Sequence, residues 1–123
     1  MAQDEGTGAL DAVPIGIMKI DRDWRVSYLN PTGAAVVGYE PEALVGADYW
    51  ASFPANLEEY SQFGPAYRSV METREACTIE AFYPDPLNAW FEVRAIPDRD
   101  GIALYFTDVT ERRMAQDLSL IHI

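Results

Sequence analysis

Cysteine, histidine and lysine are almost missing from this sequence, which has one of each among its 123 residues. The lone cysteine, Cys77, excludes an internal disulfide and any metal site built on a cysteine pair, and it favours a reducing compartment. The lone histidine, His122, is the second-to-last residue. We therefore expect a cytoplasmic domain that folds without disulfide or metal cross-links.

Positive charge is also scarce in this chain. Nine Lys and Arg residues stand against 20 Asp and Glu residues, which gives a formal net charge of -11. The resulting field repels phosphate backbones, so the sequence argues against nucleic-acid binding. Hydrophobic runs stay well below the roughly 18 residues that cross a bilayer. The first residues, MAQDE, lack the basic region of a signal peptide, so we expect neither a signal peptide nor a membrane span.

The chain does contain enough apolar material for one core, because 49% of its residues are hydrophobic and 24% are charged. Residues 1–8 are small, polar and acidic, which predicts a disordered leader. We place a single domain at residues 9–110. An exit or linker helix with its tail is expected at residues 111–123.

The first part of the domain predicts a hairpin followed by a helix. Residues 15–20 and 25–29 have the β-branched, alternating pattern of strands and are joined by a tight turn. Asn30 then offers an N-cap, and Pro31 a first helical residue whose missing N–H would have no partner there. The short helix is expected to end at Gly38.

Residues 39–75 predict a series of short helices broken by glycine and proline. The longest is expected to begin at Asn56-Leu57 and to be kinked or restarted in its middle by Gly64-Pro65. Its apolar side chains recur three and four residues apart, which predicts one buried stripe. The stripe consists of Leu57, Tyr60, Phe63, Tyr67, Val70 and Met71.

Three further strands are predicted at residues 77–83, 90–96 and 102–107, joined by turn-forming segments into two hairpins. Asp108 stands three residues before Glu111, the spacing of a capping box that begins a helix. Together the elements predict an α+β fold. It consists of a five-stranded antiparallel sheet, short helices inserted between strands 2 and 3, and a C-terminal exit helix.

Four stretches of the sequence carry a family resemblance, which covers residues 10–113. They are Pro14–Asp21 (PIGIMKID), Val26–Pro31 (VSYLNP), Gly38–Gly46, and Trp90–Pro97 together with Gly101 and Tyr105–Arg112. In this order the sequence resembles a PAS domain of the histidine-kinase-associated branch, a sensor module of bacterial two-component signal transduction. The resemblance implies a homodimer, and an output domain on the same chain, such as a kinase or cyclase.

PAS domains bind ligands between the concave face of the sheet and the helices, so the resemblance implies a pocket there. The strand parity that it suggests turns alternate residues of the strands inward to meet the helical stripe. An apolar, aromatic wall of this kind suits an apolar or aromatic small molecule, and it equally suits an ordinary packed core. The residues expected to line the pocket are Met18, Ile20, Tyr49, Trp50, Tyr60, Phe63, Tyr67, Met71, Phe91, Val93, Leu104 and Phe106.

The identity of a cofactor stays open, and the absence of any cofactor is one of the alternatives. A cysteine-linked flavin is disfavoured because the segment that would carry the reactive cysteine reads Gly46-Ala-Asp-Tyr49-Trp50. Haem held by histidine is disfavoured because His122 lies beyond the domain. Carboxylate pairs such as Asp98 and Asp100 are typical of solvated faces, so no metal site is predicted.

The resemblance also implies a signal relay where the last strand meets the exit helix, with Asp108, Thr110 and Glu111 as the expected relay residues. Dimer contacts are expected around the outer face of the first strand and along the exit helix, whose apolar residues have coiled-coil spacing. The candidates are Leu10, Val13, Ile15, Ile17, Met114, Leu118 and Ile121. Each of them could equally be intramolecular core.

Two other classes of function stay open at this point. One is a PAS fold without a ligand, used for dimerisation or for docking a partner protein. The other is a small α+β enzyme with a carboxylate acid or base in its pocket. The domain has no histidine, no Gly-x-Ser-x-Gly elbow and no phosphate-binding glycine loop, so we predict a module that is not itself an enzyme.

Overall fold

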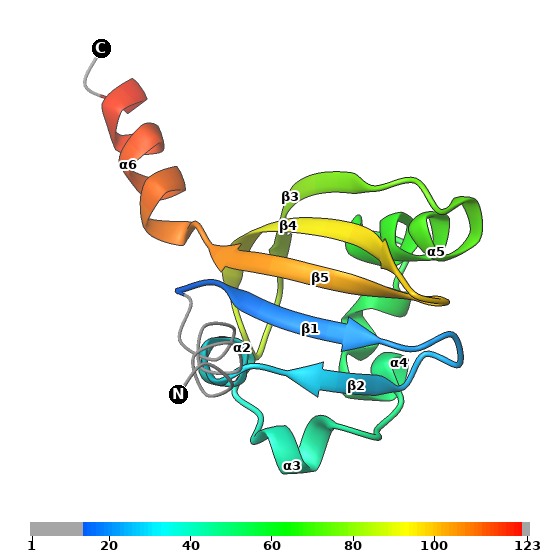
Figure 1. Ribbon diagram of the computed structural model, residues 1–123. Coiled ribbons are helices and arrows are strands. Elements are labelled where there is room, and N and C mark those ends of the chain that lie inside the picture. Colours follow the sequence, from blue (N-terminus) through cyan, green and yellow to red (C-terminus); the bar gives the residue numbers. More distant parts are fainter. Residues whose placement is uncertain (1–13, 122–123) are drawn as a thin grey trace, which may run out of the picture.

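The computed structural model describes residues 14–121, with side chains described through residue 117 (Figure 1). Its five strands form one sheet in the order β2-β1-β5-β4-β3, and every neighbouring pair is antiparallel. The last strand in the sequence therefore lies in the centre of the sheet. The strands are β1 (Gly16–Ile20), β2 (Val26–Leu29), β3 (Cys77–Tyr83), β4 (Ala89–Asp98) and β5 (Gly101–Asp108).

The short helices between β2 and β3 gather on one side of the sheet, and the last helix extends away beyond the end of β5 (Figure 1). This arrangement confirms the predicted α+β fold, including the insertion of the helices between strands 2 and 3. The helices are α2 (Pro31–Val37), α3 (Pro41–Leu44), α4 (Tyr49–Ser52), the 3-10 turn η1 (Pro54–Leu57), α5 (Phe63–Thr73) and α6 (Thr110–Ile121).

The predicted start of α2 is confirmed at both of its signal residues. Asn30 is the N-cap, and its side-chain Oδ1 accepts a hydrogen bond from the N–H of Gly33 at 2.8 Å. Pro31 is the first helical residue, where no N–H partner is needed. Gly38 ends the helix with φ 77°, a left-handed conformation that residues with a Cβ rarely adopt.

The predicted start of the long helix was wrong. α5 begins at Phe63, whereas Asn56 and Leu57 end the turn η1. Pro65 falls in the first turn of α5, where a proline breaks no helical hydrogen bond, so it favours a start rather than a kink. As a result Leu57 and Tyr60 lie outside the helix on the surface, with 58% and 64% of their area exposed.

The strand parity predicted for the three central strands is confirmed. Met18 of β1 is paired with Leu104 of β5, and Val93 of β4 is paired with Phe106 of β5. All four side chains are buried in the main core, which fills the space between the sheet and the helices. Because side chains alternate along a strand, the residues between them point to the outer face of the sheet.

The capping-box register predicted for the exit helix was also wrong. β5 continues through Asp108, and α6 begins only at Thr110. The carboxylate of Asp108 therefore accepts a hydrogen bond from the N–H of Thr110, at 2.9 Å, rather than from that of Glu111. Asp108 still satisfies one of the free N–H groups at the helix start.

Candidate functional site

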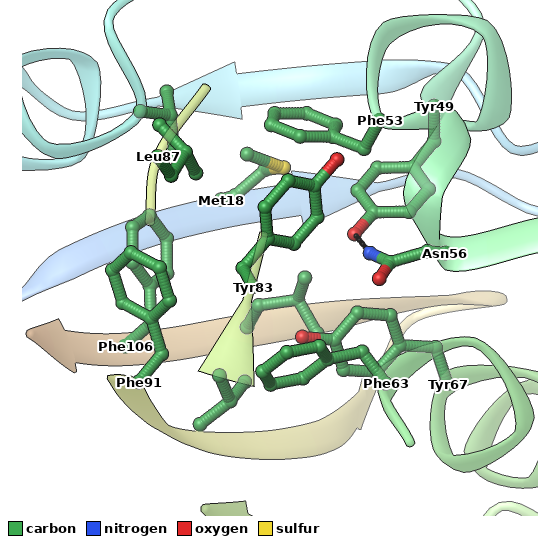
Figure 2. A pocket seen from close by; sticks show the side chains of 13 residues that line it. Met18, Tyr49, Phe53, Asn56, Phe63, Tyr67, Tyr83, Leu87, Phe91 and Phe106 are labelled. Atoms are coloured by element: carbon green, nitrogen blue, oxygen red, sulfur yellow. Dashed lines mark hydrogen bonds between the residues drawn. The ribbon is translucent and has the colours of Figure 1, made fainter. Parts of the chain in front are cut away.

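A cavity lies between the concave face of the sheet and the helices α4 and α5, and side chains from both layers line it (Figure 2). Its volume is about 50 Å³, which is room for a few waters. The lining residues are Met18, Val37, Tyr49, Phe53, Asn56, Phe63, Tyr67, Tyr83, Leu87, Phe91, Val93, Leu104 and Phe106.

Most of the residues expected to line a pocket are brought together here. The helical segment contributes aromatic rings, and the sheet contributes apolar side chains from β1, β4 and β5, as the strand parity requires. These expected residues are Met18, Tyr49, Phe63, Tyr67, Phe91, Val93, Leu104 and Phe106.

Four expected pocket residues lie elsewhere. Tyr60 is exposed because α5 begins after it. Trp50 packs on Trp24, with 4.8 Å between ring centroids, so its ring is turned away from the lining. Ile20 is fully buried beside the cavity without lining it, and Met71 is half-buried near the end of α5.

Five lining residues were missed by the sequence analysis: Val37, Phe53, Asn56, Tyr83 and Leu87. Tyr83 could have been found, because the alternation of β3 places it on the same face as the buried Ala81. The other four come from helix ends, turns and loops. No periodic pattern marks such positions, so only the folded chain brings them to the cavity.

A chain of buried hydrogen bonds holds one polar wall of the cavity. The N–H of Gly64 donates to Ser61 Oγ at 3.2 Å, and Ser61 Oγ donates to Asn56 Oδ1 at 3.0 Å. Asn56 Nδ2 then donates to the hydroxyl oxygen of Tyr49 at 2.8 Å, as Figure 2 shows. Gly64 lies so close under the carbonyl of Asn56 that no Cβ fits there, which ties the start of α5 to η1.

The cavity contains neutral phenol groups and no fixed charge. Burial raises the pKa of the Tyr49 and Tyr67 hydroxyls above the ordinary value of 10.0 for tyrosine. Burial also raises the pKa of Tyr83, opposed by a hydrogen bond with the backbone of Ala55. No Asp, Glu, Lys, Arg or His is among the described lining residues.

Neither a metal centre nor a cysteine site coincides with this cavity. Within residues 14–121 no three His, Cys, Asp or Glu side chains are grouped in a way that could hold a metal ion. Cys77 is half-buried at the start of β3 and does not line the cavity. His122 lies outside the described residues.

On the outer face of the sheet, Trp90 of β4 anchors the beginning of the exit helix. The backbone N–H of Trp90 donates to Thr110 Oγ1 at 2.9 Å, and the backbone carbonyl of Trp90 accepts from the N–H of Val109 at 2.8 Å. Of the expected relay residues, Thr110 is therefore bonded to the sheet, Asp108 caps the helix start, and Glu111 is exposed.

Glu80 of β3 adds two ion pairs to this junction. Its two carboxylate oxygens accept hydrogen bonds from Arg112 and Arg113, each at 2.6 Å. The guanidinium of Arg113 also lies 3.6 Å from the ring centroid of Trp90. We call Glu80, Trp90, Arg112 and Arg113 the exit-helix clamp.

The expected dimer contacts have mixed positions. Ile17 is only 2% exposed, which fits the alternative that it is intramolecular core, and its role in a dimer stays a prediction. Ile15 is half-buried, and Met114 is 59% exposed on α6. Two further candidates, Leu10 and Val13, lie outside the described residues, as do the side chains of Leu118 and Ile121.

The family model described as PAS fold matches residues 10–114. This match spans most of the sequence, and the chain therefore belongs to the PAS family. Among curated proteins none matches it. No helix within residues 14–121 is both long and apolar enough to traverse a lipid bilayer.

Solved structures with the same fold include sensor proteins. An RNA-binding light-oxygen-voltage receptor is 26% identical, with a TM-score of 0.70, over 98% of this chain and 37% of that chain. The PAS domain of BvgS from Bordetella pertussis is 23% identical, with a TM-score of 0.64, over 98% and 91%.

A third similar structure is the photoactive yellow protein domain of the sensor histidine kinase Ppr from Rhodospirillum centenum. It is 16% identical to this chain, with a TM-score of 0.66, over 83% of this chain and 92% of that chain. The chain is thus a PAS domain, and its fold is that of PAS modules found in histidine kinases.

Proposed function

We propose that this domain senses an apolar or aromatic small molecule in its core cavity and relays occupancy through α6 to an output domain, such as a kinase or cyclase. In this proposal the module is cytoplasmic, homodimeric and not itself an enzyme. The observation that carries the proposal is that the same two strands contribute residues to both the cavity and the exit-helix clamp. β3 and β4 line the cavity on one face and hold the exit-helix clamp on the other.

Alternation along these strands gives the relay a short physical path. Tyr83 and Phe91 line the cavity, while Glu80 and Trp90 belong to the clamp. Trp90 directly precedes Phe91 in β4, so a shift of the Phe91 ring acts on a backbone that is hydrogen-bonded to Val109 and Thr110. A ligand that favours one of two packings of these strands would bias the position of α6.

Ligand binding is tested with ethylbenzene, an apolar probe the size of one substituted ring. We expect saturating ethylbenzene to raise the melting temperature of the chain, because a ligand that binds only the folded state stabilises it. Val93→Phe fills the cavity and should abolish the shift, whereas Val45→Phe, at a site 44% exposed, should leave it unchanged. The absence of a shift in the wild-type chain would contradict the proposal.

The relay is tested by Glu80→Gln, which removes the charge that both arginines share. The pKa of Glu80 is lowered, mainly by the hydrogen bond from Arg113, so the carboxylate is charged at neutral pH. The ion pairs of the clamp are lost when the pH falls through that lowered pKa. We expect hydrogen exchange of the α6 amides to rise several-fold in Glu80→Gln. The melting temperature should change little, because exposed ion pairs contribute little to stability.

Glu92→Gln is the matched control for the clamp. Glu92 is the direct partner of Glu80 across β3 and β4, and it forms no ion pair within the described part of the chain. Equal exchange rates in α6 for both variants would show that the clamp does not hold the helix.

The small volume of the cavity also favours a second candidate function, a ligand-free PAS module for dimerisation or protein docking. This candidate predicts no response to any ring-sized probe and no small molecule in native mass spectra of the purified chain. In this candidate the clamp still holds α6 against the sheet. The ethylbenzene test therefore examines ligand sensing, and the hydrogen-exchange test examines the attachment of α6.

A further inference from the structure

The cavity contains a hydroxyl group that has no hydrogen-bond partner among the described residues. Tyr67 is 3% exposed, and within the described residues its hydroxyl forms no hydrogen bond. Every fully enclosed side-chain polar atom in the described part of the chain has a hydrogen-bond partner. The Tyr67 hydroxyl has none, so it is not fully enclosed and opens onto the cavity that Tyr67 lines. Figure 2 shows it pointing from α5 back across the pocket.

Tyr49 presents a second donor to the same space. Its oxygen already accepts from Asn56 Nδ2, and Asn56 is held in that orientation by Ser61 on its other side. The proton of the Tyr49 hydroxyl has no acceptor within the described residues. The rings of Tyr49 and Tyr67 are 6.0 Å apart between centroids, and both side chains line the same cavity.

The surroundings decide which ligand group suits these donors. Burial keeps both phenols protonated, because it raises their pKa values, so both donate hydrogen bonds at ordinary pH. The described lining has no cation to balance a carboxylate or phosphate. Apart from Asn56 and the Tyr83 hydroxyl, the remaining lining residues are apolar.

We propose that the cavity binds a neutral, single-ring molecule with one acceptor oxygen, an aromatic carbonyl compound, whose oxygen accepts hydrogen bonds from Tyr67 and Tyr49. This inference rests on the proposed ligand-sensing function and narrows it to a chemical class. Acidic ring compounds are excluded from the class because their charge would be buried without a partner.

The test compares acetophenone with ethylbenzene, which has a similar shape and lacks the oxygen. The dissociation constant of each is measured by NMR titration of the whole chain, and the ratio of the ethylbenzene value to the acetophenone value is compared among variants. Tyr67→Phe is expected to lower this ratio about tenfold, the size of one buried hydrogen bond. Its affinity for ethylbenzene should stay close to that of the wild type.

Tyr60→Phe is the control, because the Tyr60 ring is 64% exposed and does not line the cavity. It should leave the ratio unchanged, and Tyr49→Phe should lower it if Tyr67→Phe fails to fold. An unchanged ratio in a folded Tyr67 or Tyr49 variant, with ethylbenzene still bound, would overturn the carbonyl inference and leave ligand sensing intact. If neither compound binds the wild-type chain, the proposed function itself fails.

Discussion

Asn30→Ala is expected to destabilise the domain by about 3 kcal/mol and to lower its melting temperature by about 10 °C. Asn30 is fully buried, and its Oδ1 accepts from the N–H of both Ile17 and Gly33, each at 2.8 Å. Its Nδ2 donates to the carbonyl of Ile15 at 2.9 Å. One side chain thus caps α2 and also satisfies the backbone of β1.

The size of the effect follows from what the substitution leaves behind. Loss of a helix cap alone costs about 1 kcal/mol. The buried N–H of Ile17 would also lose its side-chain partner, and an unsatisfied buried donor costs about 1–3 kcal/mol. The two costs add because they concern different backbone groups.

Asp48→Ala separates the two contributions by urea or thermal unfolding. Asp48 is the N-cap of α4, where its carboxylate accepts only from the N–H of Ala51, at 2.8 Å, in an exposed hydrogen bond. We expect Asp48→Ala to cost about 1 kcal/mol, the value of a cap alone. A loss of similar size in Asn30→Ala would refute the role of Asn30 as a buried link between β1 and α2.

The second large effect is a steep loss of stability at alkaline pH. Burial raises the pKa values of Tyr49 and Tyr67 above 10.0, the ordinary value that applies in the unfolded chain. Above pH 10 the unfolded chain releases these phenol protons while the folded chain keeps them, so the free energy of unfolding falls as the pH rises. Below pH 10 this contribution is fully present.

Each tyrosine accounts for about 1.4 kcal/mol per pH unit above pH 10, so the pair should cost about 3 kcal/mol at pH 11. Tyr67→Phe is expected to reduce the slope by one tyrosine, measured by urea unfolding between pH 8 and about pH 11. Its stability at neutral pH should change little, because the Tyr67 hydroxyl has no partner among the described residues. Tyr60→Phe is the control, because that ring is 64% exposed. Identical slopes in wild type and Tyr67→Phe would contradict the burial of a protonated phenol.

The two faces of β3 and β4 connect these features to the proposed sensing. The cavity side carries neutral phenols and apolar rings, whereas the outer side carries Glu80 and the arginines of α6. Changes in one layer reach the other through the strand backbone, without a long chain of intervening side chains. Because such coupling is reciprocal, variants on the outer face that alter α6 should also shift the affinity for ring-sized probes.

The sequence by itself determined the α+β fold and most of the sheet wall of the cavity. Local signals were sufficient for these features: Asn30 and Pro31 mark the start of α2, and alternation turns Met18, Val93 and Phe106 toward the core. Each signal depends on backbone geometry within a few residues, so it can be recognised before the chain is folded.

Only the tertiary structure decided the start of α5, the polar wall of the cavity and the exit-helix clamp. Gly64 packs under the carbonyl of Asn56, and this close contact fixes the end of η1 and the beginning of α5. Glu80 meets Arg113 across more than 30 positions of sequence. Such contacts depend on which elements become neighbours in space, and no local period in the sequence encodes that pairing.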